Sequence, residues 1–506
     1  MPNWAHRTGA GKPSSSMSNP AQPALLLEAP ATVLAVIRIQ VSGERYLPKD
    51  EFHKYNLQGA LKVSEKIPGP KSAVLLAEQR RYDSNALVYP NQVPLAISRG
   101  LGATVEDVDG NIFIDFSGGV GALNVGHSNP EVVLAIKKQA EKFAHGLDFP
   151  SVSRVALSKK LVELAPGQLK GSSTVLMCGP TGADAVEAAV KLTKFHTKKP
   201  GIVSFEGGWH GVSGVSLSLT AKRAAKANYL PGVPEVYFAP YPYCFRCPFG
   251  VKHPECGLAC AHYLEHMIKD PDTGLAAPGG LLIEPIQGEG GVVVPPAGYM
   301  KEIRRICDDN ALLLIADEIQ TGFCRTGKMF AVEHEGITPD IMTVSKSMGS
   351  GLPISGIVFR KELDNWAPGA HVGTFRGNAL SCAAGVAGIK FMENHKLADR
   401  SARLGQKVLK RCMELQAQFD AIGDVRGRGL YVGIEFVKKD ATHSPHADLL
   451  AMLQKECFPK GLIVWKGGRA GNVARIMPAL VISDELLDAG MAIFEEGLKA
   501  VTKKWG

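Results

Sequence analysis

Three short stretches of the sequence place polar groups directly after apolar runs, where such groups can bind or transform a small molecule. The first, MCGPTGADAVEAA, ends a predicted strand in a Gly/Pro turn and begins a helix near Ala183, which leaves unpaired backbone N–H groups at the positive end of a helix dipole. Such a turn can bind phosphate. It lacks the GxxxxGKS pattern and a full GxGxxG, which argues against a nucleoside triphosphate or a dinucleotide. Taken alone, it favours an ordinary tight turn.

The other two stretches carry charged side chains at the end of a predicted strand. Asp317 and Glu318 follow the apolar run ALLLIA, and Lys346 follows DIMTVS. A carboxylate buried at a sheet edge is costly unless a cation pairs with it. A lysine held there can be desolvated enough to act as an amine nucleophile. Considered separately, Asp317 is as readily a structural carboxylate, and Lys346 is more readily a surface charge.

Together, the three features meet the needs of one cofactor, pyridoxal 5′-phosphate. The start of the helix would bind its phosphate, the lysine would form a Schiff base with it, and the aspartate would keep its pyridine nitrogen protonated so that the ring accepts electrons. In open parallel sheets, ligands bind beyond the carboxyl ends of the strands, which is where all three features are expected. The sequence therefore predicts a pyridoxal-phosphate enzyme.

The elements expected to position these groups alternate between strand and helix along the chain. Apolar spacing predicts helices over 129–145, 183–197 and 297–310 and strands over 173–178, 201–205, 279–287 and 311–318. A hairpin turn at Asp109 and Gly110, flanked by alternating apolar residues, precedes them. Alternating strands and helices imply a mainly parallel sheet covered by helices on both faces. The predicted fold class is therefore α/β, with a large domain of this kind and a smaller C-terminal α/β domain.

The chain is long enough for more than one core, and we expect four segments. Residues 1–65 are predicted to be a flexible N-terminal extension, because their periodicity is poor and they end near the Pro/Gly break KIPGPKS. Residues 66–115 are expected to contribute to the small domain, 116–375 to form the large cofactor-binding domain, and 376–506 to form the C-terminal small domain.

Composition excludes several classes of function. The formal net charge of +8 is spread over 506 residues without a long basic run, so no nucleic-acid partner is expected. No apolar run is long enough to span a membrane. The ten cysteines of so long a chain suggest reduced thiols, so we expect a soluble, cytoplasmic protein, with an organelle as the alternative because the first 27 residues contain no acidic residue.

Across about residues 66–506, the sequence resembles the class III pyridoxal-phosphate aminotransferases of fold type I. Five separated motifs carry the resemblance in the family's order and approximate spacing, namely EDVDGNIFIDFSGGVGALNVGHSNPEVVLAIKKQ, FEGGWHG, EPIQGEGGVVVPP, IADEIQTGFCRTGKMFAVEHEGITPDIMTVSK and ARIMPALVIS. The resemblance implies a transaminase with a large sheet domain and a smaller C-terminal domain.

The resemblance also implies roles around the cofactor. Lys346 matches the Schiff-base lysine, which also moves the catalytic proton, and Asp317 matches the second catalytic residue, which pairs with the pyridinium nitrogen. Gln320 matches a residue that approaches the phenolic oxygen of the ring. Trp209 matches the aromatic residue that stacks on the ring, although it is also consistent with plain packing. His210 is expected beside the cofactor, with its role left open.

Further matches concern the phosphate and the substrate. Gly182 and Ala183 match the phosphate-binding turn, and Thr374 matches a threonine that binds the phosphate of the partner subunit. The resemblance thus implies a homodimer with shared active sites, or a tetramer built from it. Arg475 matches the arginine that binds a substrate α-carboxylate, and Glu289 matches the glutamate that neutralises this arginine when the amino donor has no carboxylate there.

Two departures from the family pattern stand out. Asp184 replaces the family's usual glutamate, and Ala183 brings no hydroxyl group to the phosphate, so backbone donors must suffice. Arg376, in TFRGN, stands where the family commonly has glycine and adds a positive charge near the site. Both variants resemble the diaminobutyrate:2-oxoglutarate and 4-aminobutyrate aminotransferase branch.

The function implied is ping-pong transamination from an ω-amino donor, such as 2,4-diaminobutyrate, 4-aminobutyrate or ornithine, to a keto acid such as 2-oxoglutarate. The alternative is an amino-acid racemase or epimerase on the same fold, because the same cofactor and lysine can return a proton to the opposite face. No sequence feature separates the two activities.

A cysteine loop, residues 244–260, is not accounted for by the resemblance. It arranges Cys244, Cys247, Cys256 and Cys260 as CxxC, eight residues, then CxxxC. Four thiolates in such an array can bind structural zinc or an iron–sulfur cluster. The short spacing between the pairs favours packing or redox-labile thiols instead.

Overall fold

The computed structural model describes residues 50–64 and 66–503. Most of the predicted extension, residues 1–49 together with residue 65, lies outside the described residues. The part of it that is described packs against the rest of the chain. The Asp50 carboxylate pairs with Arg400 at 2.5 Å, and the Asn56 side chain donates to the Val481 carbonyl at 3.1 Å. Packing thus begins by Asp50, earlier than residue 66.

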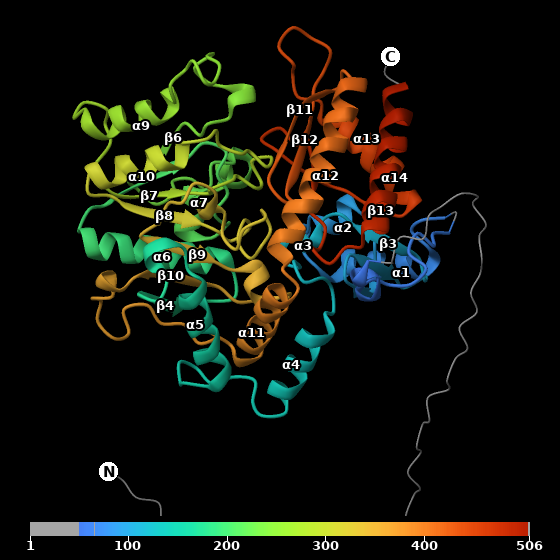
Figure 1. Cartoon of the computed structure of the whole chain (residues 1–506), viewed down its shortest axis with the longest axis horizontal. Coiled ribbons are helices and arrows are strands. Elements are labelled where there is room, and N and C mark those ends of the chain that lie inside the picture. Colours follow the sequence, from blue (N-terminus) through green and yellow to red (C-terminus); the bar gives the residue numbers. More distant parts are fainter. Residues whose placement is uncertain (1–49, 65, 504–506) are drawn as a thin grey trace, which may run out of the picture. The chain divides into compact units, whose positions relative to one another are not determined.

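The central element is a seven-stranded sheet in the order β4-β10-β9-β8-β7-β5-β6 (Figure 1). Its strands are β4 (Ser173–Met177), β5 (Gly201–Phe205), β6 (Val236–Ala239), β7 (Pro278–Ile283), β8 (Leu313–Asp317), β9 (Ile341–Val344) and β10 (Gly356–Arg360). The strands from β9 to β6 are parallel, and β10 runs antiparallel to both β9 and β4. This confirms the predicted α/β class with a mainly parallel sheet.

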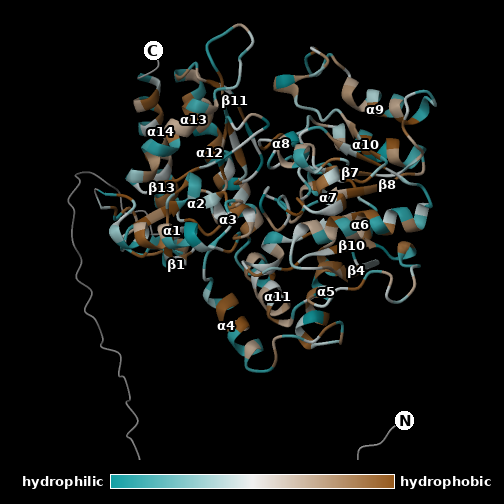
Figure 2. Cartoon of the chain, turned by 180° about the vertical axis from the view of Figure 1, so that it is seen from behind, coloured by the Kyte–Doolittle hydropathy of each residue, from teal (hydrophilic) through white to brown (hydrophobic). Residues whose placement is uncertain are grey.

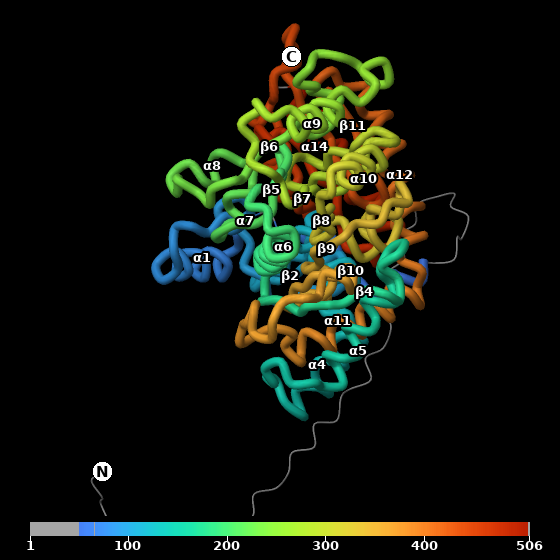
Figure 3. The backbone as a smooth tube through the Cα atoms, turned by 90° about the vertical axis from the view of Figure 1, so that its left-hand side faces the viewer, coloured from blue at the N-terminus to red at the C-terminus, as the bar shows by residue number. Residues whose placement is uncertain are grey.

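Both faces of this sheet are buried, because alternate side chains of each strand enter two different cores. In β7, Leu282 packs with the side chains of α6 (Gly182–Thr197), whereas Leu281 and Ile283 pack in the main core with α9, α10 and α5. Figure 3 shows α6 and α10 on opposite sides of the sheet, and in Figure 2 the strand β8 is among the brown, hydrophobic segments. Burial on both faces explains why these strands read as continuous apolar runs.

The helices that cover the central sheet follow its strands along the chain. They are α5 (Val152–Leu164), α6, α7 (Gly214–Leu219), α9 (Ala259–Lys269) and α10 (Tyr299–Asp309). Two further helices pack on these, α8 (Arg223–Lys226) on α7 and α11 (Ala379–Asn394) on α5. Short 3-10 turns lie between them at η2 (Gly167–Leu169), η3 (Ala227–Tyr229), η4 (Cys244–Arg246), η5 (Ala331–His334), η6 (Lys346–Gly349) and η7 (Lys361–Leu363). The positions of α6 and α10 agree with the predicted helices.

A second, antiparallel sheet forms from the last part of the chain. Its strands lie in the order β11 (Ile422–Gly427), β12 (Val432–Phe436), β15 (Val473–Ile476) and β14 (Trp465–Gly467). Three helices belong to this part of the chain, namely α12 (Leu397–Gln418), α13 (Ala447–Cys457), which is followed by η8 (Phe458–Lys460), and α14 (Asp484–Lys503). The helices α12 and α13 contact this sheet, and α14 packs on α13.

A third sheet joins the N-terminal segment to the C-terminal part of the chain. It contains β1 (Ile97–Leu101), β2 (Thr104–Asp107), β3 (Ile112–Asp115) and β13 (Leu462–Ile463), which is parallel to β3. The pairing of β2 with β3 confirms the hairpin predicted around Gly110, whose φ of 87° suits glycine. The remaining elements near it are η1 (Glu51–Tyr55), α1 (Pro70–Tyr82), α2 (Tyr89–Gln92), α3 (Gly118–Gly121) and α4 (Pro130–Ala140).

No helix across residues 50–64 and 66–503 combines the length and the apolar character needed to cross a bilayer.

Candidate active site

An inner cavity of about 410 Å³ lies at the carboxyl ends of β8 and β9. Most of the residues predicted to bind the cofactor line it, namely Gly182, Ala183, Trp209, His210, Asp317, Gln320 and Lys346, together with Glu289. Parallel strands bring their carboxyl ends to one sheet edge, so residues far apart in the sequence meet there. The structure therefore gathers these eight residues around a single cavity.

Lys346 begins η6, immediately after β9. Its backbone adopts a left-handed conformation with φ of 44°, which is unusual for a lysine and turns the chain sharply at the sheet edge. Burial lowers the pKa of Lys346, although the carboxylates of Glu289 and Asp317 oppose the shift. A lysine with a lowered pKa is more often neutral, which is the form that attacks a carbonyl group.

Asp317 is the last residue of β8 and is fixed from three directions. One carboxylate oxygen lies 2.7 Å from Nδ1 of His210, and the other accepts the hydroxyl of Thr343 at 3.1 Å and the N–H of Ile319 at 3.2 Å. The side chains of His210 and Asp317 are both buried. The pair defines a role for His210 that the sequence left open, because His210 orients the carboxylate that faces the cavity.

The predicted phosphate-binding turn lies at the start of α6. The Asp184 carboxylate accepts both the N–H and the hydroxyl of Thr181 at 2.8 Å, so the aspartate that departs from the family pattern holds the turn closed. Among the described residues, the backbone N–H groups of Gly182 and Ala183 have no acceptor. These two N–H groups suit a phosphate at the cavity. A Cβ at position 182 would lie 2.8 Å from Cδ1 of Ile319, so a larger residue there would require the end of that side chain to move.

Gln320 is held by groups at both ends of its amide. Its Nε2 donates to the carbonyl of Val120 at 3.1 Å, and its Oε1 accepts the hydroxyl of Tyr431. Tyr431 is buried and comes from the loop between β11 and β12, so the second sheet contributes to the position of a cavity residue.

Glu284 directly follows β7, next to the strand β8 that ends in Asp317, and it also lines the inner cavity. Its carboxylate accepts the N–H of Trp209 at 2.9 Å and the N–H of Gly288 at 2.8 Å, so it fixes two cavity loops at once. Burial raises the pKa of Glu284 to about 7, although the nearby His210 lowers it.

Arg475 and Glu289 form an ion pair beside the cavity. Arg475 lies in β15, its side chain is 0% exposed, and its Nη1 is 2.5 Å from Oε1 of Glu289. Burial raises the pKa of Glu289, but Arg475 and Lys346 outweigh this effect and hold the pKa below its ordinary value. A Cβ at position 467 would lie 2.8 Å from Nε of Arg475, so Gly467 leaves room for the guanidinium group.

Thr374 is a predicted cofactor residue that the structure leaves outside the inner cavity. It lies in the loop between β10 and α11 and is exposed. Its neighbours Val372 and Phe375 are exposed apolar side chains, at 70% and 65%. Arg376, next in sequence, is buried instead.

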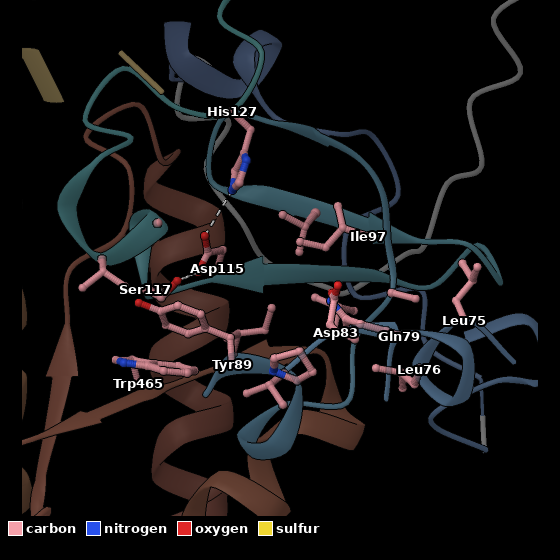
Figure 4. Close-up of a pocket in the computed structure, with 18 of the residues that line it drawn as sticks. Leu75, Leu76, Gln79, Asp83, Tyr89, Ile97, Asp115, Ser117, His127 and Trp465 are labelled. Atoms are coloured by element: carbon pink, nitrogen blue, oxygen red, sulfur yellow. Dashed lines mark hydrogen bonds and ion pairs between the residues drawn. The ribbon is translucent and has the colours of Figure 1, made fainter. Parts of the chain in front are cut away.

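An outer cavity of about 770 Å³ is lined mainly by apolar side chains of α1, α2, β1 and β13 (Figure 4). The backbone N–H of Ser117 donates a hydrogen bond to the Asp115 carboxylate there, and Asp115 also lies 3.2 Å from Nε2 of His127. Tyr89 and Trp465 pack with ring centres 5.0 Å apart. Burial and the Glu289 carboxylate raise the pKa of Tyr89, so this ring lies within electrostatic reach of the inner cavity.

The four cysteines of the cysteine loop line a small cavity of about 20 Å³. All four are free thiols. Within the part of the chain that the structure describes, no three His, Cys, Asp or Glu side chains form a group able to hold a metal ion. Burial raises the pKa of Cys260 to about 11, which disfavours its thiolate form.

Sequence reasoning missed Glu284 and Tyr431. Glu284 obeys the same rule as Asp317, a polar residue directly after an apolar strand, and this rule could have found it. Nothing near Tyr431 in the sequence indicates its contact with Gln320, which lies 111 positions away.

Comparison with protein families gives a match over residues 88–498 to the model for "Aminotransferase class-III". A diaminobutyrate–2-oxoglutarate aminotransferase of Rhizobium meliloti is 39% identical over 425 residues, which cover 82% of this chain and 90% of the relative. An alanine/serine racemase of Pyrococcus horikoshii is 34% identical, over 87% of this chain and 92% of the relative.

Solved structures agree with the fold. The ornithine aminotransferase of Toxoplasma gondii, described with partial occupancy of pyridoxal phosphate at its active site, aligns with a TM-score of 0.74 and 29% identity. The alignment covers 86% of this chain and 95% of that structure.

Proposed function

The chain belongs to the class III aminotransferases, which use pyridoxal phosphate, and from this we propose that it transfers the ω-amino group of a donor such as 2,4-diaminobutyrate, 4-aminobutyrate or ornithine to a keto acid such as 2-oxoglutarate. The observation that carries the proposal is the ion pair of buried Arg475 with the partly exposed Glu289, beside Lys346. Glu289 can leave Arg475 when a substrate α-carboxylate binds there, and it can stay paired with Arg475 when the donor has no carboxylate at that position.

The residues of the inner cavity fit the cofactor. When bound, pyridoxal phosphate supplies a carbonyl group that takes up the amine and a ring that accepts electrons. The N–H groups of Gly182 and Ala183 would bind its phosphate, and Asp317, oriented by His210, would hold the proton on its ring nitrogen. Trp209 would stack on the ring.

Lys346 would both hold the cofactor and move the proton. Burial lowers its pKa, so a larger fraction of its amine is neutral, and thus able to accept a proton from the reacting carbon, than in an exposed lysine. Two half-reactions with one amine carrier give ping-pong kinetics.

Arg475 and Glu289 would select among substrates at one site. A substrate α-carboxylate can displace Glu289 and pair with Arg475 in a bidentate manner. When the reacting carbon of the donor bears no carboxylate, Glu289 stays paired and no buried charge is left without a partner.

The assembly we propose is a homodimer with shared active sites, or a tetramer built from it. Exposed Thr374, flanked by the exposed side chains of Val372 and Phe375, would bind the phosphate in the partner subunit. Exposed apolar side chains clustered in this way are typical of an interface. Light scattering at micromolar concentration tests this, because a monomer with full activity would contradict it.

We also propose a cytoplasmic location, which the free state of all ten cysteines supports.

The deciding experiment is a panel of amino donors, each assayed with 2-oxoglutarate and with pyruvate. The proposal expects the fastest turnover with an ω-amino donor, and turnover only of α-amino groups would contradict it. A second candidate, amino-acid racemisation, is favoured by the similarity to the Pyrococcus horikoshii racemase. Loss of chirality without any keto acid would identify a racemase.

A further inference from the structure

Another cavity, which we call the antechamber, adjoins the inner cavity. It has a volume of about 880 Å³ and shares Trp209 and Glu289 with the inner cavity, so the two spaces are neighbours across these side chains. Four basic and two acidic residues line the antechamber, namely Lys222, Arg223, Lys226, Arg469, Glu206 and Glu289.

The two acidic residues of the antechamber are already paired. Glu206 lies 3.5 Å from Arg469, and Glu289 lies 2.5 Å from Arg475. Neither of these carboxylates is therefore left to neutralise the basic side chains of Lys222, which precedes α8, and of Arg223 and Lys226 within it.

Lys222 and Arg223 have no ion-pair partner among residues 50–64 and 66–503. Lys226 donates to the Ser218 carbonyl at 3.2 Å and lies over the Phe238 ring at 4.3 Å, and burial lowers its pKa. The wall formed by α8 and the residue before it therefore carries uncompensated positive charge that lines the antechamber, next to the inner cavity.

Lys222 stands at the point where the two cavities meet. Its Nζ lies 5.7 Å from the centre of the Trp209 ring, and its charge helps to lower the pKa of Glu289. It is thus the basic residue of the antechamber that reaches both of the shared side chains.

The inner cavity offers no cation for a second carboxylate. Lys346 is the one Lys or Arg that lines it within the described chain, and its amine is needed for the reaction. Arg475 is the proposed partner of the first carboxylate of the acceptor. Val212, which also lines the inner cavity, is an exposed apolar residue.

We propose that Lys222, with Arg223 beside it, binds the distal carboxylate of the amino-group acceptor, so that the acceptor is a 2-oxo dicarboxylate. This inference rests on the proposed transamination, whose acceptor places its first carboxylate at Arg475. A five-carbon dicarboxylate has its second carboxylate several bonds beyond the reacting carbon, and the antechamber that Lys222 lines adjoins the inner cavity across Trp209 and Glu289. The contact is a charge-assisted hydrogen bond at a wet surface, and it should weaken as the salt concentration rises.

The test compares Lys222→Met and Lys222→Arg with Lys301→Met. The methionine keeps an unbranched apolar stem and removes the charge, and the arginine keeps the charge. Lys301 is an exposed lysine of α10 that lines neither cavity, so its variant reports the general effect of losing a surface lysine.

The first measurement is calorimetric binding of glutarate and butyrate to the holoenzyme, which needs no turnover. We expect wild type and K301M to bind glutarate more tightly than butyrate, K222M to lose about fivefold in glutarate affinity, and K222R to retain it. Butyrate affinity should not change. Equal glutarate affinity in K222M and K301M, or no preference for glutarate in wild type, would overturn the inference.

The second measurement is the KM for 2-oxoglutarate and for pyruvate at a fixed donor concentration. K222M should raise the KM for 2-oxoglutarate alone, with kcat unchanged, and an equal rise for both acceptors would overturn the inference. The two proposals can fail separately. A wild-type protein that prefers glutarate but transfers no amino group would refute the proposed function and leave the carboxylate site standing.

Discussion

Replacing Glu289 by glutamine should separate donors according to whether the reacting carbon bears a carboxylate. The Arg475 side chain is 0% exposed and its partner lies 2.5 Å away, while the lowered pKa of Glu289 keeps the pair ionised at neutral pH. The neutral amide of Glu289→Gln leaves the guanidinium charge uncompensated. A hydrogen bond to a charged group contributes about 1.5–3 kcal/mol, so kcat/KM for 4-aminobutyrate should fall by about ten- to a hundredfold.

Donors with a carboxylate on the reacting carbon should behave differently. Glutamate brings its own partner for Arg475 and no longer has to displace Glu289, so its KM should stay the same or fall in E289Q. The assay is steady-state kinetics of both donors with one acceptor. Glu206→Gln is the matched control, because it removes a longer pair of 3.5 Å whose carboxylate side chain is 47% exposed. An equal loss of kcat/KM for both donors in E289Q would refute the proposed role of the Arg475–Glu289 pair in selecting between them.

Three further predictions concern the cofactor, the pH dependence of stability and the cysteine loop. Gly182→Ala places a Cβ 2.8 Å from the Ile319 side chain, so cofactor affinity should fall about tenfold in equilibrium dialysis, and unchanged affinity would contradict the turn as the phosphate site. Burial raises the pKa of Glu318 to about 7, above its ordinary 4.5, so the stability it contributes is lost as pH rises through that window. The free energy of unfolding of Glu318→Gln, measured in urea relative to wild type, should therefore increase by up to about 3 kcal/mol between pH 5 and pH 8. A difference that does not change with pH would refute this. Purified protein should carry less than about a tenth of an equivalent of zinc by mass spectrometry, because no metal-binding group is formed among the described residues, and a full equivalent would contradict that geometry.

The central sheet and much of the inner cavity could be predicted because they follow from local patterns. Apolar runs buried on both faces identify the strands, and the residue after such a run must lie at the sheet edge. This rule predicts Asp317 and Lys346 at the carboxyl edge of the sheet, and both side chains line the inner cavity there.

The remaining contacts could not be predicted because they depend on how distant segments pack. His210 meets Asp317 across 107 positions, and Tyr431 reaches Gln320 from another sheet. No local period or turn encodes such pairs. The packing of Asp50 against the rest of the chain is similar, since it depends on Arg400, which is 350 positions away.

The central claim, that Lys346 holds the cofactor and moves the proton, is tested most directly by the turnover of Lys346→Ala with the best donor of the panel. The phosphate turn and Asp317 remain intact in this variant, so it should fold and still bind pyridoxal phosphate noncovalently. Turnover should fall below about a hundredth of the wild-type value, because both the covalent anchor and the base are lost. A variant that retains more than that fraction would contradict the mechanism.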